Sequence, residues 1–263
     1  MCGINGIFSK KNGSTIDIEQ LKKMSDSMIH RGPDDSGVYR NTDKTIGFSF
    51  RRLSIIDLKN GHQPMSNADK NIWIVFNGEI YNHLDLRKEL LNNGYKFRTK
   101  SDTEVILHGY SMWGKNVVNH LRGMFAFAIW NEKEKDLFLA RDRLGIKPLY
   151  YYNDNQFVFS SEIKGINALS NVEQKLNNEA MYHYLTFSST PAPLTMFKKI
   201  KKLEPGHTLL VKQNGEIIKQ KYWEPIFNNN SVLELSENDI IKELNILIRK
   251  SIELRMMSDV PYG

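Results

Sequence analysis

Residues 125–130, which read Phe-Ala-Phe-Ala-Ile-Trp, are apolar at every position and constrain the fold more than any other stretch of the sequence. A strand with one face in water alternates apolar and polar side chains, whereas an uninterrupted apolar strand is covered on both faces. The run therefore indicates a layered sandwich, and the polar turns at residues 131–135 and 153–155 predict antiparallel hairpins. The four strands expected in this region are at residues 124–130, 137–140, 149–152 and 157–160.

The rest of the chain mixes strand and helix signals, which indicates an α+β fold. Apolar residues recur at helical spacing in several segments, and Ser101 with Glu104 three residues later matches a capping box that opens a helix. The other expected helices are at residues 17–29, 84–91 and 178–186, the other strands at residues 46–50 and 72–76, a hairpin at residues 208–223, and turns at residues 34–37 and 77–78.

The sequence changes character after Trp223. Residues 227–231 read Phe-Asn-Asn-Asn-Ser, an asparagine-rich stretch that is typical of a linker. Ser236 then opens an amphipathic helical pattern that has little of this chain to pack against. We therefore expect residues 1–225 to form one domain, and residues 226–263 to be a linker and the first helix of a truncated second domain.

Composition excludes several classes of protein. The 263 residues include 40% hydrophobic residues, enough for a core, and no run of about 18 apolar residues that would cross a membrane. The net charge of +6 invites a nucleic-acid-binding interpretation, but the basic residues are interleaved with 30 acids. The N-terminus is too short and too polar for a signal peptide, so we expect a cytoplasmic protein.

The single cysteine lies at position 2, where packing needs it least. It excludes an intrachain disulfide and a cysteine-based zinc site. Methionine aminopeptidase generally removes Met1 when a small residue follows, and Cys2 then carries an α-amino group with a pKa of about 7.7–8.0. That amine can take the thiol proton and later protonate a leaving group. Cys2 is therefore the expected nucleophile of an N-terminal-nucleophile enzyme.

Attack of a thiolate on an amide creates an oxyanion, which needs preorganised hydrogen-bond donors. Asn77 and Gly78, at the end of an expected strand, offer a side-chain amide and an unhindered backbone N–H. Taken alone, the dipeptide favours a plain turn.

A small amino-acid substrate also presents a carboxylate and an ammonium group. Arginine suits the carboxylate, and Arg51 and Arg52 follow an expected strand. Glu79 and Asp102 suit the ammonium group. Taken singly, each of these residues is also consistent with a surface charge or a helix cap.

Eight short segments, occurring in a fixed order, are more informative together than any of these residues taken singly. In order they are Met-Cys-Gly-Ile at 1–4, His-Arg-Gly-Pro-Asp at 30–34, Arg-Leu-Ser-Ile-Ile-Asp at 52–57, Gly-His-Gln-Pro-Met at 61–65, Asn-Gly-Glu-Ile-Tyr-Asn at 77–82, Ser-Asp-Thr-Glu at 101–104, Gly-Met-Phe-Ala-Phe-Ala at 123–128 and Ala-Arg-Asp-Arg-Leu-Gly-Ile-Lys-Pro-Leu-Tyr at 140–150. Together they resemble the glutaminase domain of glutamine-hydrolysing asparagine synthetases, which are class II glutamine amidotransferases. The resemblance runs from Met1 to about Trp223.

The resemblance implies a four-layer αββα sandwich of the N-terminal-nucleophile hydrolases, with two antiparallel sheets between helices. It implies that the site needs no metal and that L-glutamine is the substrate, hydrolysed to glutamate and ammonia through a thioester. It assigns Cys2 as the nucleophile, Asn77 and Gly78 to the oxyanion hole, Arg52 to the glutamine carboxylate, and Glu79 and Asp102 to the surroundings of its ammonium group.

The family's second domain uses ATP and Mg²⁺ to activate aspartate, and the ammonia then yields asparagine, AMP and pyrophosphate. Its loop Ser-Gly-Gly-x-Asp-Ser normally follows a segment similar to residues 258–263, and this chain contains no such loop. We therefore expect no cofactor in this chain, no asparagine synthesis by this chain alone, and the synthetase domain as a partner. A homodimer is a further expected assembly; nucleic acid and membrane are not expected partners.

Three alternatives stay open at this point. The ammonia could serve another acceptor, as in sugar-phosphate amination, purine synthesis or amidation of surface polysaccharides, although residues 77–82 favour the asparagine-synthetase group. The chain could be an inactive truncated remnant that binds without turnover. It could also be a basic nucleic-acid-binding module.

Overall fold

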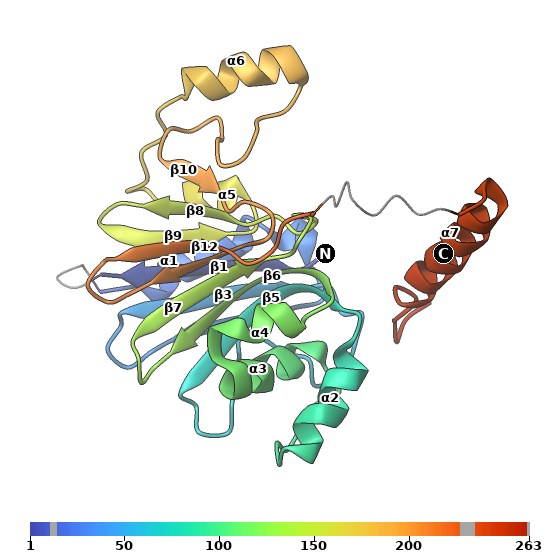
Figure 1. Cartoon of the computed structure of the whole chain (residues 1–263). Helices are drawn as coiled ribbons and strands as arrows, with labels where there is room; N and C mark the ends of the chain where they lie inside the picture. The colour runs from blue at the N-terminus through green and yellow to red at the C-terminus, as the bar shows by residue number, and fades with distance from the viewer. Residues whose placement is uncertain (11–14, 227–234, 262–263) are drawn as a thin grey trace.

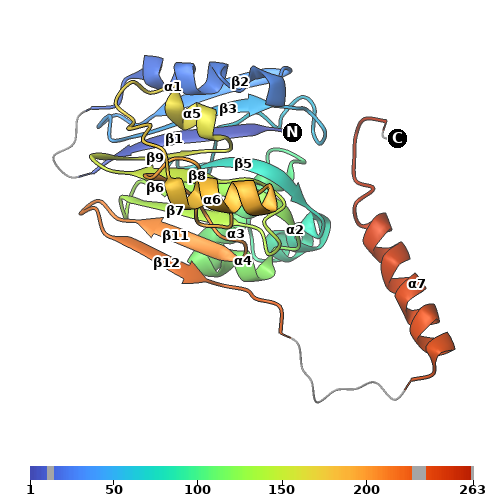
Figure 2. The same ribbon diagram turned by 90° about the horizontal axis from the view of Figure 1, so that it is seen from above.

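Two six-stranded antiparallel sheets face each other, and helices cover their outer faces (Figures 1 and 2). The computed structural model describes residues 1–10, 15–226 and 235–261. This order of layers confirms the α+β prediction of an αββα sandwich.

The first sheet carries the N-terminus in its interior. Its strand order is β10 (Ile200–Lys202), β8 (Tyr150–Asn153), β9 (Gln156–Ser160), β1 (Gly3–Ser9), β3 (Ile46–Arg52) and β2 (Asp35–Arg40). Helices α1 (Ile18–Asp26) and α5 (Ile163–Asn167) pack on its outer face, and Leu21, Met24 and Ile166 are buried there against Ile7 and Val158. Because β1 lies between β3 and β9, the strand that directly follows residue 2 is anchored by neighbouring strands on both sides.

The second sheet has the order β12 (Ile217–Lys221), β11 (His207–Val211), β7 (Asp136–Arg141), β6 (Gly123–Asn131), β5 (Ile72–Ile80) and β4 (Met65–Ser66). Its outer face is covered by α2 (His83–Asn92), α3 (Asp102–Trp113) and α4 (Val117–His120), with the short 3₁₀ helix η2 (Gly114–Asn116) between the last two. A second 3₁₀ helix, η1 (Ile29–Arg31), follows α1.

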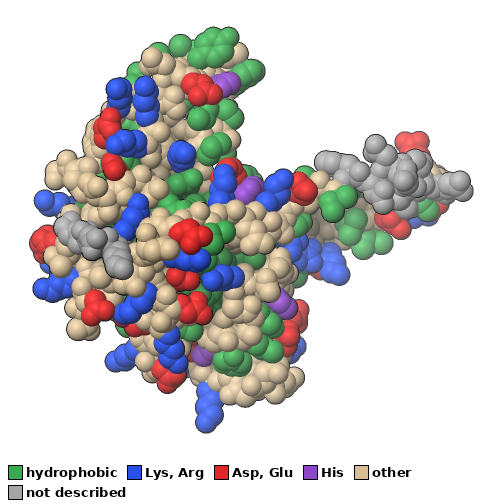
Figure 3. Space-filling model, turned by 60° about the vertical axis from the view of Figure 1, so that its left-hand side comes forward, with side chains coloured by type: hydrophobic (Ala, Val, Ile, Leu, Met, Phe, Trp, Pro, Cys, Tyr) green, Lys and Arg blue, Asp and Glu red, His purple; other side chains and the backbone are tan. Residues whose placement is uncertain are grey.

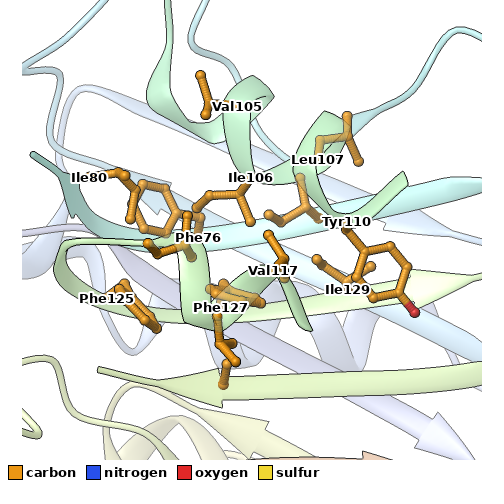
Figure 4. Close-up of a cluster of buried hydrophobic side chains, with 14 of the residues drawn as sticks. Phe76, Ile80, Val105, Ile106, Leu107, Tyr110, Val117, Phe125, Phe127 and Ile129 are labelled. Carbon is orange, nitrogen blue, oxygen red and sulfur yellow. The ribbon is translucent and has the colours of Figure 1, made fainter. Parts of the chain in front are cut away.

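Strand β6 is buried on both faces, as its composition predicts. Phe125, Phe127 and Ile129 point toward α3 and α4 (Figure 4), whereas Ala128 and Trp130 lie between the two sheets. Full burial of one such large side chain contributes about 1.5–3 kcal/mol. The uninterrupted apolar run therefore holds the second sheet to both of its neighbouring layers.

Several local predictions were wrong. Residues 34–37 are not a turn, because β2 begins at Asp35 and pairs with β3. Asn77 and Gly78 are not a turn either, since they lie inside β5, opposite Ala126 and Phe125 of β6. Asn-Gly pairs favour turns locally, but here the long pairing with β6 overrides that preference.

The capping box at the start of α3 is only half formed. The Ser101 hydroxyl accepts from the Thr103 N–H, as expected for an N-cap. The Glu104 carboxylate does not complete the box. It accepts instead from the backbone N–H groups of Arg98 and Thr99 at 2.7–3.1 Å. Glu104 thereby fixes the loop that leads into α3.

Two helices project from the sandwich. Helix α6 (Asn178–Phe187) forms a lobe whose tip exposes hydrophobic side chains, on a face where basic and acidic residues are otherwise interspersed (Figure 3). Helix α7 (Glu237–Glu253) is capped by Ser236, as predicted, and has no buried residue. The expected linker at residues 227–231 lies outside the described residues. Within the described ranges, no helix is both long and apolar enough to cross a membrane.

Candidate active site

Cys2 lies directly before β1, at the edge of the sandwich where several loops meet. Its thiol contacts the backbone of Leu53, in the loop after β3. The Leu53 N–H donates to Sγ at 3.4 Å, and the thiol donates to the Leu53 carbonyl oxygen at 3.6 Å. Arg31 donates from Nε to the Cys2 carbonyl oxygen at 2.8 Å and pairs with Glu162. Burial raises the pKa of the Cys2 thiol, and the Leu53 N–H opposes that rise.

The chain terminus beside this thiol favours a neutral amine. Burial is the main cause that lowers the pKa of the Met1 α-ammonium group, and the cations of Arg31 and Lys147 lower it further. This amine belongs to Met1; removal of Met1, which the sequence predicts, would place the terminal amine on Cys2 itself, beside the thiol.

Arg52 is the last residue of β3 and is buried. Its guanidinium donates to three carbonyl oxygens of residues 53–58, which we call the site loop: Leu58 and Ile56 at 3.0 Å and Asp57 at 2.7 Å. A guanidinium has five N–H donors, so two remain for a ligand in the cavity that Arg52 lines. Arg51 instead points to the other face of the sheet and pairs with Asp26, which removes it from the site.

Asn77 and Gly78 line one cavity together with Cys2. Asn77 is 1% exposed, and within the described part of the chain its Nδ2 has no hydrogen-bond partner. Buried donors are almost always paired, so an unpaired one points to a ligand. At Gly78 a β-carbon would stand 2.2 Å from the Met124 carbonyl oxygen, so only glycine fits this strand pairing.

Glu79 and Asp102 are two neighbouring carboxyl groups that line the same small polar cavity as Cys2 and Arg52. Asp102 is the first residue of α3 and accepts from the Ile80 N–H at 3.0 Å. Burial and the charge of Asp102 raise the pKa of Glu79 to about 8, and burial also raises the pKa of Asp102. Among the described residues neither carboxyl group is in an ion pair within 4 Å, so both are open to an incoming cation, whose charge would favour their ionised forms.

Sequence reasoning missed several residues that shape this pocket. Gln63 donates to the Phe76 carbonyl oxygen at 3.2 Å and accepts from the Phe76 N–H at 2.7 Å, which ties the loop after β3 to β5. At Gly61 a β-carbon would stand 2.2 Å from Arg52 Nη2, so a larger residue would displace the guanidinium. Both lie in the segment at 61–65, which marked the family without indicating these contacts.

Lys147 was also missed. It is 5% exposed and lines the cavity that contains Cys2, Asn77 and Glu79. Burial lowers the pKa of its ammonium group, and the charge of Glu79 is the largest influence in the opposite direction. The six residues predicted for the site therefore lie around adjoining cavities, and a cationic side chain accompanies them.

The arrangement provides the chemical groups needed to attack an amide. A thiol stands at a chain end beside an unpaired amide donor, and a guanidinium and two carboxyl groups lie in the adjoining cavity. A ligand with one carboxylate, one ammonium group and one side-chain amide would meet a complementary group at each position.

Comparison with known proteins agrees with this chemistry. The pattern of the glutamine amidotransferase domain matches residues 1–223. Asparagine synthetase [glutamine-hydrolyzing] 1 of Bacillus subtilis is 43% identical over 266 residues, which cover 100% of this chain and 41% of that protein. A putative asparagine synthetase [glutamine-hydrolyzing] 2 of Methanocaldococcus jannaschii is 38% identical over 289 residues, covering 100% of this chain and 54% of that protein.

Solved structures share the fold. The allosteric regulatory enzyme of purine biosynthesis superposes with a TM-score of 0.63 at 20% identity, over 86% of this chain and 50% of that one. Glutamine phosphoribosylpyrophosphate amidotransferase of Bacillus subtilis superposes with a TM-score of 0.58, also at 20% identity and over the same shares of the two chains. This chain therefore spans about half the length of the proteins that it matches.

Proposed function

Because the chain belongs to the glutamine amidotransferase domain family, we propose that it hydrolyses L-glutamine to glutamate and ammonia through a thioester on Cys2. The observation that carries the proposal is the unpaired Asn77 Nδ2, buried in the wall of a cavity that also contains the only sulfhydryl of the chain. Among the described residues this donor has no partner, so it is available to a substrate oxygen that becomes negative.

The reaction begins when the α-amine of Cys2, freed by removal of Met1, takes the thiol proton. The thiolate then forms a bond with the side-chain amide carbon of glutamine, and the oxyanion accepts from Asn77 Nδ2 and the Gly78 N–H. The C–N bond breaks, and the amine returns its proton to the departing ammonia. Water then attacks the thioester, the C–S bond breaks, and glutamate leaves the free thiol behind.

Substrate orientation follows from the charges of the site. Arg52 keeps one N–H on Nε and one on Nη1 free of the site loop, and its charge and one of these groups bind the α-carboxylate. Glu79 and Asp102 receive the α-ammonium group, whose charge restores the ionised form of Glu79. Lys147 adds a positive charge near Cys2 and favours the thiolate over the thiol.

The role of the whole protein is proposed from its relatives. We propose that the ammonia serves asparagine formation, as the names of the relatives that are 43% and 38% identical indicate. Residues 1–225 would be the glutaminase domain, and residues 226–263 would begin a synthetase domain that uses ATP and Mg²⁺, with which the glutaminase domain works as a partner. The exposed apolar side chains of α7, which include Leu244 and Leu247, support such a partner. A cytoplasmic location and a homodimer belong to the same proposal.

The test is ammonia release from L-glutamine by the purified chain and by C2A. The expected result is turnover by the parent chain and none by C2A, with glutamine binding retained because Arg52, Glu79 and Asp102 are untouched. Full turnover by C2A would overturn the proposal. Glutamine binding by the parent chain without ammonia release would favour the inactive remnant.

A further inference from the structure

We infer that residues 255–261, which follow α7 and which we call the clasp, hold the site loop in place and thereby set the reactivity of Cys2. The inference deepens the proposed function and rests on it for its kinetic readout. Its chemical readouts do not depend on turnover.

Two hydrogen bonds join the clasp to the site loop. The Asp57 N–H donates to Asp259 Oδ2 at 2.8 Å, and the Asp259 N–H donates to the Ile55 carbonyl oxygen at 2.9 Å. A third contact lies at the other end of the clasp, where the Arg255 guanidinium carbon is 4.8 Å from the centroid of the Tyr81 ring. The clasp is therefore attached at both ends, beside β5 and at the site loop.

Asp57 shows why this attachment matters for the shape of the site loop. Its φ of 47° is in the left-handed region, which disfavours a non-glycine residue. Its side chain accepts from the Lys100 N–H and from the Asn60 N–H, and its carbonyl oxygen accepts from Arg52. With these groups engaged, the N–H of Asp57 has Asp259 as its acceptor, so the clasp supplies the remaining hydrogen bond that holds this residue in its left-handed conformation.

The site loop connects the clasp to the sulfur of Cys2. Leu53, at the start of the loop, brackets Cys2 Sγ on both its N–H and its carbonyl side. The clasp also forms a wall of the cavity in front of the thiol, through Met257, Val260 and Pro261. Loss of the clasp would thus loosen the group that touches Sγ and open the cavity at the same time.

The experiment compares D259A with D259N in the full chain. Alanine removes the acceptor, whereas asparagine keeps a side-chain oxygen that can accept from the Asp57 N–H. E253A is the matched control, because Glu253 is an exposed carboxylate at the end of α7 with no contact to the site loop. The readouts are the rate of alkylation of the single cysteine by iodoacetamide, hydrogen exchange of the Asp57 amide, and KM and kcat for glutamine.

We expect D259A to raise the alkylation rate and the KM for glutamine about three- to tenfold, and to accelerate exchange of the Asp57 amide, because one charge-assisted hydrogen bond is lost. D259N and E253A should stay within about twofold of the parent chain. Alkylation and exchange in D259A equal to those of the parent would overturn the inference, as would fast exchange of the Asp57 amide in the parent itself. D259N behaving as D259A would overturn the role of the acceptor. A parent chain that releases no ammonia would contradict the proposed function. The alkylation rate of Cys2 and the hydrogen exchange of the Asp57 amide would still test the role of the clasp.

Discussion

Replacement of Asn77 by alanine separates transition-state stabilisation from folding. Its Nδ2 is buried without a partner among the described residues, so the free protein carries a desolvated donor that gains nothing from the protein. Leaving such a group unsatisfied costs about 1–3 kcal/mol. Alanine removes that cost, and this gain offsets the poorer van der Waals packing around the smaller side chain. The Tm of N77A should therefore stay within a few degrees of the parent value.

In contrast to Tm, the kcat of N77A should fall strongly. Loss of one oxyanion donor costs about 2.7–4 kcal/mol of transition-state stabilisation, or a factor of about 10²–10³ in kcat. The assay is steady-state ammonia release together with thermal unfolding of the same preparations. N155A is the matched control, because Asn155 is exposed in the turn between β8 and β9 and should change neither quantity. A kcat within about threefold of the parent value, or a Tm reduced by more than about 10 °C, would refute the reasoning.

Two further predictions follow from burial. Because the pKa of Glu79 is raised from 4.5 to about 8, the folded state binds more protons than the unfolded state in that window, and stability should fall as pH rises through it. E79Q lacks this group, so its free energy of unfolding should exceed that of the parent by about 3–5 kcal/mol at pH 9 and by nothing at pH 4. Its KM for glutamine should rise. Urea titrations at both pH values check this, with the exposed E89Q as control, and an equal difference at both pH values would contradict it. F127A should lose about 3–5 kcal/mol of stability because Phe127 is fully buried. F187A, at an exposed position of α6, should lose almost none. Equal losses would disprove the burial of β6 beneath α3 and α4.

The apolar run of β6 allowed the layered architecture to be predicted from the sequence, because burial on both faces leaves a continuous apolar pattern. Strand β1 escaped prediction because it mixes Gly3, Asn5 and Gly6 with apolar residues. Gly6 and Asn5 are needed for contacts with β9. A β-carbon at Gly6 would stand 2.2 Å from the Phe159 ring, and the Asn5 side chain accepts a hydrogen bond from Ser160. Such contacts are set by distant parts of the chain and leave no periodic signal.

The predicted site residues are brought together around two adjoining cavities, but their partners could not have been read from spacing. Residue spacing alone did not distinguish Arg51 from Arg52, and the alternation of side chains along β3 separates them. The long-range contact of Asp259 with Asp57 joins residues 202 positions apart. Nothing local in the sequence announces such a pairing.

The central claim is best tested by the intact mass of the active chain before and after treatment with a diazoketone analogue of glutamine. We predict a protein that lacks Met1, gains one adduct on Cys2 and loses ammonia release in proportion to labelling. A fully active protein that keeps Met1 or carries an acyl group on its N-terminus, or an adduct on another residue, would contradict the account.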